Sequence, residues 1–389
     1  MSENEAKFVE FKIEEGKIDF VCNDIKNGQE RTIELYFHFD KPITPCNDAI
    51  AAAVSTMIRL LYKKVYIDLD ISSRVLEIMK KFNRAEITCK TVMEDKPATV
   101  RNGYSLNFSG GFDSLAAMYL VPDAKLVSVD FVGRYGRERE FFSLFDTNIV
   151  STNARNYGFV GYYGFCGVGS ILYADALGIK IQYSGNILEE GPQWLREGGI
   201  KPRTTIGVST SYDIRHINLT TGLTEVGTTI IACHYAPEHI SKSLFSLANQ
   251  RSEKIYRKKM LVQIASEILN KKIEIDGEIL PPRILSEWNN YFATDFLSIY
   301  FLKKLGRDAI RQYLINIPDE IAALTDKLSL SFYEKFNTNY LEQIPIDIRG
   351  TFLARMSQAG IMPYNEIDWK EFRIVADCLA KYYPKINVA

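Results

Sequence analysis

Residues 109–114, Ser-Gly-Gly-Phe-Asp-Ser, combine the groups that a phosphate-binding loop needs. The paired glycines let the backbone approach an anion closely and adopt a positive φ at little cost. The N–H groups of such a loop, and of a helix that follows it, point toward the anion. Ser109 and Ser114 add hydroxyl donors, and Asp113 either caps the helix or holds a Mg²⁺ ion. We therefore expect this segment to bind the phosphates of a nucleotide.

The elements around this loop suit that role. An apolar run at 106–108 comes before it, and a helix-forming segment at 113–120 follows and ends before Pro122. The order strand, loop, helix distinguishes a nucleotide loop from an ordinary Gly-Gly turn with a helix cap, which is the alternative interpretation. The Walker A pattern, G-x-x-x-x-G-K-[ST], does not occur in the chain.

The composition indicates a globular protein of two or three domains, because 389 residues are too many for one small core. No apolar run reaches membrane-spanning length, and the first residues are polar and mostly acidic, so we expect a cytoplasmic protein without a membrane anchor. A net charge of −1 argues against a protein-wide nucleic-acid surface and leaves a local patch open. The six cysteines are widely spaced without a C-x-x-C pair, so we expect reduced thiols and no zinc site.

We predict an α/β fold with three domains. Residues 1–100 form an α+β domain, 101–245 an α/β nucleotide-binding domain with a parallel sheet, and 246–389 a helical domain. The predicted strands are 8–13, 18–21, 32–39, 64–69, 105–108, 125–131, 149–151, 180–184 and 228–233. The predicted helices are 48–61, 72–82, 113–120, 138–145, 156–177, 252–270, 288–305, 307–316 and 369–382.

Four loops of the second domain are expected at one edge of its sheet. Ligands of parallel α/β sheets bind outside the carboxyl ends of the strands. That edge gathers the 109–114 loop, Asp130 with Phe131, residues 152–153, and the Ser-Gly-Asn run at 184–186. The sequence thus predicts one nucleotide site built from several strand ends.

The run S-G-G-x-D-S at 109–114 resembles the signature of the PP-loop ATP pyrophosphatase superfamily, whose members cleave ATP to AMP and pyrophosphate. Within it, Arg155-Asn156, a small-residue helix and Gly185-Asn186 are similar to the run seen in 7-cyano-7-deazaguanine synthases. The segment 229–234 followed by Ser241-Lys242 also matches their last strand and Ser/Thr-Lys pair. This resemblance covers residues 102–250 and implies a HUP-like parallel sheet for the α/β domain.

The resemblance implies an enzyme that uses ATP and Mg²⁺ to adenylate a carboxylate and then passes the acyl group to a nitrogen nucleophile. It implies an acyl or nucleobase-like substrate, and a homodimer stays open. The catalytic residues that it implies are Asp113, Ser114, Arg155 and Lys242, with Asp113 as the Mg²⁺ ligand. The nucleotide-binding residues that it implies are Ser109, Gly110, Gly111, Phe112, Asp113, Ser114, Asp130, Phe131, Gly185 and Asn186.

Two differences from the synthases bear on the substrate. Their four zinc-binding cysteines are absent, since residues 252–259 stand at that place. Their Tyr-Pro-Asp-Cys run after G-x-N is replaced by residues 188–194, Leu-Glu-Glu-Gly-Pro-Gln-Trp. The reaction type therefore transfers more readily than the deazaguanine substrate.

Other residues have both a functional and a plain interpretation. Glu189-Glu190 could bind Mg²⁺ or a substrate cation, although a solvated turn is the common role of paired acids. The basic segment 251–259 could touch RNA, but such runs are usually exposed helix faces. His234 and His239 are five residues apart, which does not suit two ligands on one helical face. For the glycines at 164, 167 and 169 we expect close helix packing.

Two further functions remain alternatives to the adenylating enzyme. One is a nucleotide-binding module without chemistry, which uses ATP or AMP to control contacts made by the terminal domains. The other is a PP-loop enzyme that modifies tRNA, which the near-neutral charge makes the weaker of the two.

Overall fold

The computed structural model describes residues 4–95, 99–159, 163–196, 209, 212–249 and 251–386. Its contacts divide the chain into two compact units, each made of three stretches. Unit 1 comprises Met1–Ser109, Asp123–Tyr183 and Arg203–Ile217, and unit 2 comprises Gly110–Pro122, Ser184–Pro202 and Asn218–Ala389. This division concerns contacts and does not test the domain boundaries expected near residues 100 and 245, which stay predictions.

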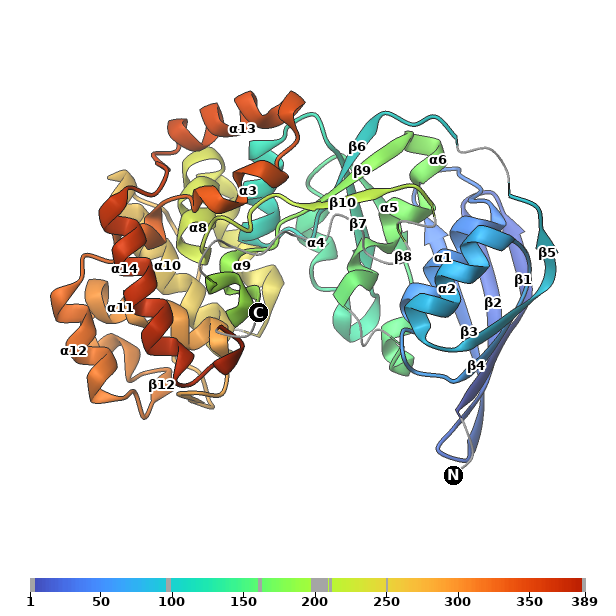
Figure 1. Ribbon diagram of the computed structural model, residues 1–389, viewed down its shortest axis with the longest axis horizontal. Coiled ribbons are helices and arrows are strands. Elements are labelled where there is room, and N and C mark those ends of the chain that lie inside the picture. Colours follow the sequence, from blue (N-terminus) through green and yellow to red (C-terminus); the bar gives the residue numbers. More distant parts are fainter. Residues whose placement is uncertain are drawn as a thin grey trace. The chain divides into compact units, whose positions relative to one another are not determined.

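Unit 1 is an α/β structure around one ten-stranded sheet, in the order β10-β9-β6-β7-β8-β3-β2-β1-β4-β5 (Figure 1). The strands after residue 100 are β6 (Gly103–Asn107), β7 (Lys125–Asp130), β8 (Thr147–Ser151), β9 (Ile179–Ser184) and β10 (Arg215–Asn218). β6 pairs in parallel with β7 on one side and with β9 on the other. The strand order therefore reverses at β6, and such a switch point is where open α/β sheets bind ligands. The strands predicted at 105–108, 125–131, 149–151 and 180–184 are confirmed.

The first 95 residues extend this same sheet. β1 (Glu5–Glu14), β2 (Lys17–Lys26) and β3 (Gln29–Phe39) form an antiparallel meander. β4 (Lys64–Ser72) pairs in parallel with β1, and β5 (Glu86–Met93) pairs in parallel with β4. β3 pairs antiparallel with β8 through His38↔Ser151 and Phe39↔Val150. The four strands predicted in this part are confirmed, and β5 is an addition.

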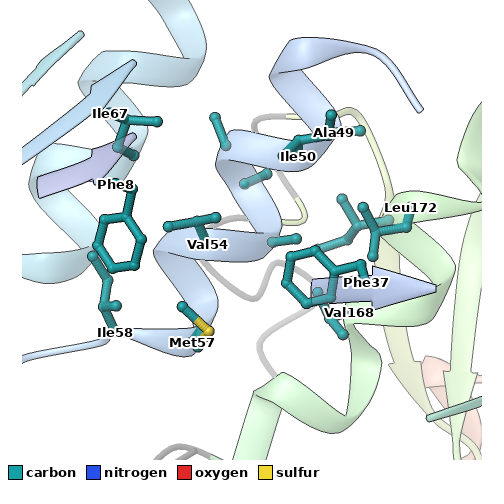
Figure 2. Close-up of a cluster of buried hydrophobic side chains, with 14 of the residues drawn as sticks. Phe8, Phe37, Ala49, Ile50, Val54, Met57, Ile58, Ile67, Val168 and Leu172 are labelled. Carbon is teal, nitrogen blue, oxygen red and sulfur yellow. The ribbon is translucent and has the colours of Figure 1, made fainter. Parts of the chain in front are cut away.

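The core of unit 1 lies around α1 (Asn47–Met57), with α2 (Ser73–Asn83) beside it (Figure 1). Residues 49–57 of α1 are all buried, which its Ala-rich sequence allows because small side chains let neighbours pack closely. Figure 2 shows Val54 between two groups of side chains, Phe8 and Ile67 on one side and Val168 and Leu172 on the other. The helix thus joins the amino-terminal strands to the segment after β8.

The single helix predicted at 156–177 is wrong. The described part of that segment contains η2 (Ala154–Tyr157), η3 (Tyr163–Gly167), α5 (Val168–Leu172) and α6 (Ala174–Leu177). Gly158 has φ +78°, which ends a helical turn, and a Cβ on Gly169 would lie 2.7 Å from Val127 Cγ1 of β7. The close packing expected of glycines in this segment is confirmed for Gly167 and Gly169, and it stays a prediction for Gly164. The helix predicted at 138–145 is shortened to α4 (Arg139–Phe142), which follows η1 (Gly133–Tyr135).

Unit 2 is mainly helical, with one short strand pair, β11 (Ser286–Glu287) and β12 (Leu314–Ile315), in the part that the structure describes. Its α-helices are α3 (Phe112–Leu120), α8 (Glu225–Tyr235), α9 (Ile240–Leu247), α10 (Glu253–Leu269), α11 (Phe292–Ile310), α12 (Asp319–Lys327), α13 (Ile346–Gln358) and α14 (Glu366–Ala380). Its 3₁₀ turns are η4 (Leu188–Glu190), η5 (Pro192–Leu195), η6 (Pro237–His239), η7 (Ser331–Glu334), η8 (Thr338–Gln343) and η9 (Pro384–Ile386). Gly306, with φ +79°, kinks α11 at the point where two predicted helices meet.

The strand predicted at 228–233 is wrong, because this segment lies inside α8. Thr224 caps the helix by accepting a hydrogen bond from the Gly227 N–H. Thr229 returns its hydroxyl to the Glu225 carbonyl, 2.7 Å away, as threonine does within helices. Among the helices that the structure describes, none is long and apolar enough to cross a membrane.

Candidate functional site

The 109–114 loop turns at Gly110, whose φ of +82° lies in the region that glycine occupies without strain. The Gly110 N–H donates to Ser114 Oγ at 3.0 Å, and the Ser114 hydroxyl donates to the Gly111 carbonyl at 3.0 Å. The Ser243 hydroxyl of α9 donates to the Gly110 carbonyl at 2.5 Å. The Ser114 hydroxyl therefore shapes the loop from within, which the sequence did not indicate. Ser109, on the unit 1 side of this turn, is exposed.

Asp113 lies in the first turn of α3 and faces α8 and α10. Its Oδ1 accepts a hydrogen bond from the Thr228 hydroxyl of α8 at 2.6 Å. Its Oδ2 lies 3.9 Å from Lys258 Nζ of α10. The Asp113 side chain keeps 28% of its surface exposed, against 3% for the Lys258 side chain. The Asp113 side chain thus remains partly exposed at the start of α3.

The loop after β9 lies directly against the start of α3. A Cβ on Gly185 would come within 2.7 Å of the Asp113 carbonyl carbon and oxygen, and 2.9 Å of the Ser114 nitrogen. Backbone atoms cannot yield at that distance, so only glycine fits. The Asn186 carbonyl accepts from the Thr220 hydroxyl at 2.8 Å. The structure therefore brings Gly185 to the predicted phosphate loop, as two neighbouring strand ends suggested.

Asp113 belongs to a set of six buried or half-buried ionisable side chains in unit 2, which we call the charge network. Its members are Asp113, Glu189, Glu225, Glu253, Arg257 and Lys258. At its centre Glu225 pairs with Arg257 through Oε2 and with Lys258 through Oε1, the latter at 2.6 Å. Four acids against two bases leave an excess of two negative charges if all are ionised.

Two further contacts complete the network. Arg257 Nε donates to Glu253 Oε1 at 2.9 Å, four residues earlier on α10. The Glu225 backbone N–H donates to Glu189 Oε1 at 2.8 Å. Burial raises the pKa of Glu189 well above its ordinary value, and burial lowers the pKa of Lys258. Burial and the nearby Asp113 thus both disfavour the ionised form of Glu189 within this network.

Lys258 and Arg257 correct the expectation that residues 251–259 form an exposed basic face. Lys258 is 2% exposed, and its Nζ lies 4.7 Å from the centre of the Phe112 ring. The burial of Lys258 could have been predicted from its position in the sequence. It stands three residues from both Ile255 and Leu261, which lie on the buried face of α10. Phe112 is itself fully buried and serves the core beneath the loop.

Lys242 lies apart from the charge network. It is exposed on α9, between the buried Ser241 and Ser243. Ser241 Oγ accepts from the Asp276 N–H at 2.8 Å, so the two serines hold the helix while Lys242 faces outward. The buried lysine next to Asp113 is Lys258, which sequence reasoning did not select.

The remaining predicted residues gather in unit 1, at the ends of β7 and β8. The Asp130 carboxylate is buried and accepts from Arg139 Nη1 at 2.6 Å and from the Val132 N–H at 3.0 Å. The Arg155 guanidinium lies 5.3 Å from the centre of the Phe131 ring and 4.5 Å from that of Tyr135. Asp130, Phe131 and Arg155 therefore form a second group, with Arg139 neutralising the acid.

Metal-binding capacity rests on single carboxylates. The described residues contain no group of three or more His, Cys, Asp or Glu side chains that could hold a metal ion. Magnesium commonly binds to one or two carboxylates together with substrate phosphates and water. The partly exposed Asp113 carboxylate fits that role, and the excess of acid in the network favours a cation beside it.

Comparisons of the chain with protein families, with curated proteins and with solved structures found no match.

Proposed function

We propose that this protein is an ATP-dependent enzyme that forms AMP and pyrophosphate. It adenylates a carboxylate-type acceptor and passes the acyl group to a nitrogen nucleophile. The observation that carries this proposal is the start of α3, where a left-handed glycine, a helix amino terminus, the Asp113 carboxylate and buried Lys258 lie together.

Each part has a role in such a reaction. Helix amino termini and glycine turns bind phosphate oxygens through backbone N–H groups. Lys258 holds a positive charge in a buried setting beside Asp113, where a fixed charge stabilises developing negative charge better than water does. A Mg²⁺ ion held by Asp113 would neutralise phosphate charge. The excess of acid in the charge network makes such a cation necessary for a triphosphate to bind there.

The chemistry needs few protein groups. A carboxylate oxygen of the acceptor attacks the α-phosphorus of ATP, and the bond to the pyrophosphate oxygen breaks. A nitrogen nucleophile then attacks the acyl carbon, AMP leaves, and the nucleophile loses a proton. Positioning and charge stabilisation account for most of the rate in phosphoryl-transfer steps of this kind.

The test is pyrophosphate release from ATP with Mg²⁺ and a panel of carboxylic acids. We expect Asp113→Ala to lower the release rate about 10²-fold or more, as loss of a transition-state charge partner does. Asp123→Ala, which removes an exposed acid just beyond α3, should leave the rate unchanged. Equal rates for wild type and Asp113→Ala would remove the catalytic role of this site.

A nucleotide-binding module without chemistry is the second candidate. It is favoured because two polar side chains of the loop already make hydrogen bonds within the protein. Asp113 accepts from the Thr228 hydroxyl, and the Ser114 hydroxyl donates to the Gly111 carbonyl. Calorimetry that detects tight binding of MgATP, together with no pyrophosphate release with any acid of the panel, would establish this second function.

A further inference from the structure

Several polar side-chain atoms of unit 2 are buried and make no hydrogen bond within the part of the chain that the structure describes. Five of these atoms are Glu189 Oε2, Trp194 Nε1, Tyr364 Oη and both amide atoms of Gln343. The others are Trp288 Nε1, Asp295 Oδ1 and Lys258 Nζ, the last of which is ion-paired with Glu225. Buried polar atoms nearly always have a partner, because leaving one without a partner forfeits the hydrogen bonds that it would make with water. So many atoms in one region point to a group that is not part of the chain.

Electrostatic and ring contacts link these residues. Burial raises the pKa of Tyr364 well above its ordinary value, and the nearby Glu189, Asp368 and Tyr340 raise it further. The Tyr340 hydroxyl donates to the Trp194 carbonyl at 2.7 Å, and the centres of the two rings lie 6.0 Å apart. Gln343 belongs to the same 3₁₀ turn, η8, as Tyr340. The first five atoms thus come from η4, η5, η8 and the segment before α14.

Glu189 connects this region to the charge network. Its Oε1 accepts from the Glu225 N–H at 2.8 Å, while its Oε2 has no hydrogen-bond partner among the described residues. Glu225 in turn contacts Lys258, which lies beside Asp113. A molecule bound at Oε2 would therefore sit next to the network that surrounds the start of α3.

We propose that Glu189 and Tyr364 form a buried subsite for the end of the acceptor substrate that carries N–H hydrogens, such as an amide or an amidine. This inference rests on the proposed function and names the chemistry of its acceptor. An ionised carboxylate only accepts hydrogen bonds, whereas the Tyr364 hydroxyl both donates and accepts. A ligand carboxylate would meet like charge at an ionised Glu189, which disfavours an anionic end.

The protonation state of Glu189 makes this subsite sensitive to pH. The charged groups that influence the pKa of Glu189 are Asp113 of α3 and Arg257 and Lys258 of α10. The charge of Glu189 in turn raises the pKa of Tyr333 of η7 and of Tyr364. Burial is the largest influence and keeps a proton on the empty Glu189 to a higher pH than usual. A cationic ligand must displace that proton, so its affinity should rise with pH, whereas a neutral amide should show a weaker dependence.

Acetamidinium, acetamide and acetate test this proposal, because they have the same planar shape and differ in charge and donors. Binding of each to the full chain is measured by ligand-detected NMR between pH 6 and 8.5. We expect acetamidinium and acetamide to bind and acetate not to bind, with acetamidinium affinity rising with pH. Glu189→Gln should lower the affinity for acetamidinium at least tenfold and abolish the pH dependence of its binding. Tyr364→Phe should lower the affinity for both acetamidinium and acetamide.

Glu190→Gln is the matched control, since it makes the same change at the exposed neighbour in η4 and should leave binding as in wild type. Thermal unfolding checks that each variant is folded. Equal binding of acetate, or Glu189→Gln with unchanged acetamidinium affinity, overturns the subsite. So does a crystal structure in which water alone satisfies these atoms with acetamidinium present.

The experiments distinguish failure of the proposed function from failure of the subsite. Wild-type protein that binds acetamidinium through Glu189 but shows no affinity for MgATP contradicts the ATP-dependent reaction and leaves the donor-binding subsite in place. Protein that releases pyrophosphate but discriminates none of the three probes contradicts the subsite alone.

Discussion

At the scale of single residues, the chain departs most from expectation at Lys258. A lysine in a run of basic residues suggests a solvated helix face, yet this one is buried between Glu225 and Asp113. Buried ion pairs are costly to build, because each charge must lose its water, and they are weak evidence of a contribution to stability. Their presence beside a glycine loop therefore favours a role in binding or catalysis over a structural one.

The glycine at 185 gives a sharp test at the same scale. Gly185→Ala would place a Cβ against backbone atoms of Asp113 and Ser114, so the first turn of α3 must shift. We expect a loss of stability of about 1–3 kcal/mol, as in other overpacked sites. If the loop binds ATP, misplacing it should also slow pyrophosphate release about 10²-fold. Chemical denaturation and the release assay measure the two effects.

Gly350→Ala is the control for that change. Gly350 is exposed within α13, and a Cβ there meets nothing within 4 Å. Alanine in a helix interior is favoured over glycine by about 1 kcal/mol, so this variant should be as stable as wild type or more stable. Similar losses for both variants would show that the contact with α3 is unimportant.

At the scale of elements, the sequence predicted most strands correctly and failed where tertiary contacts decide. Residues 228–231, Thr-Thr-Ile-Ile, are β-branched and favour a strand on propensity alone. They form a helix because Thr224 caps it and because Thr228 bonds to Asp113, more than a hundred residues away. No local pattern carries that information. The alternating strands of residues 1–70 were predictable because one face of each is buried.

The residues of the candidate site likewise fall into those that the sequence could predict and those that it could not. The loop, Asp113 and Gly185 were predictable, because their spacing relative to strands and a helix has a physical reason. The roles of Lys258, Glu225 and Thr228 were not, since each depends on how α8 and α10 pack against α3. Glu189 was noted as an acid that could receive a cation, but its burial could not be read from its neighbours.

The helix α11 carries a pH-dependent contribution to stability. Burial raises the pKa of Asp295 to about 6, although Tyr383 and the Asn289 N–H hydrogen-bond to it. Between the ordinary pKa of about 3.8 and about 6, the folded protein holds this proton more tightly than the unfolded chain does. Stability should therefore fall as pH rises through that window and level off above it.

Asp295→Asn removes the charge while it keeps an acceptor for both hydrogen bonds. Above pH 7 we expect it to raise the free energy of unfolding by about 1–3 kcal/mol, with little effect at pH 4. Urea denaturation across this range measures the difference. Asp308→Asn makes the same change at a side chain of α11 that is 99% exposed, and should leave the pH profile unchanged. If Asp295→Asn showed the same dependence of stability on pH as wild type, Asp295 would not be the group responsible for it.

At the scale of the whole molecule, the amino-terminal strands are continuous with the sheet that leads to the loop. Beyond the β3–β8 pairing, Asp40 Oδ1 accepts from the Ile149 N–H at 2.7 Å and from the Tyr173 hydroxyl at 2.8 Å. The Asn153 amide donates to the Glu34 carbonyl at 2.9 Å. The first 95 residues thus contribute strands and α1 to the core of unit 1.

We therefore expect a fragment that lacks residues 1–95 to be insoluble or to lack a cooperative unfolding transition, because β8 loses its neighbour and α5 loses α1. In the full chain, Asp40→Ala should cost about 1–3 kcal/mol by leaving Ile149 and Tyr173 without an acceptor. Asp146→Ala, at a fully exposed acid, should cost under about 1 kcal/mol. A soluble fragment with a sharp transition would instead establish autonomous domains.

The interleaving of the two units in the chain has a consequence for how such a gene can change. Each unit is assembled from three separate stretches of sequence, and the glycine loop stands where one stretch passes into the next. A single recombination event cannot exchange either unit as an intact cassette, because any one breakpoint divides at least one of them. New specificity in this lineage is therefore expected to arise by substitution and by insertion in surface loops, which tolerate added length, more readily than by shuffling of modules.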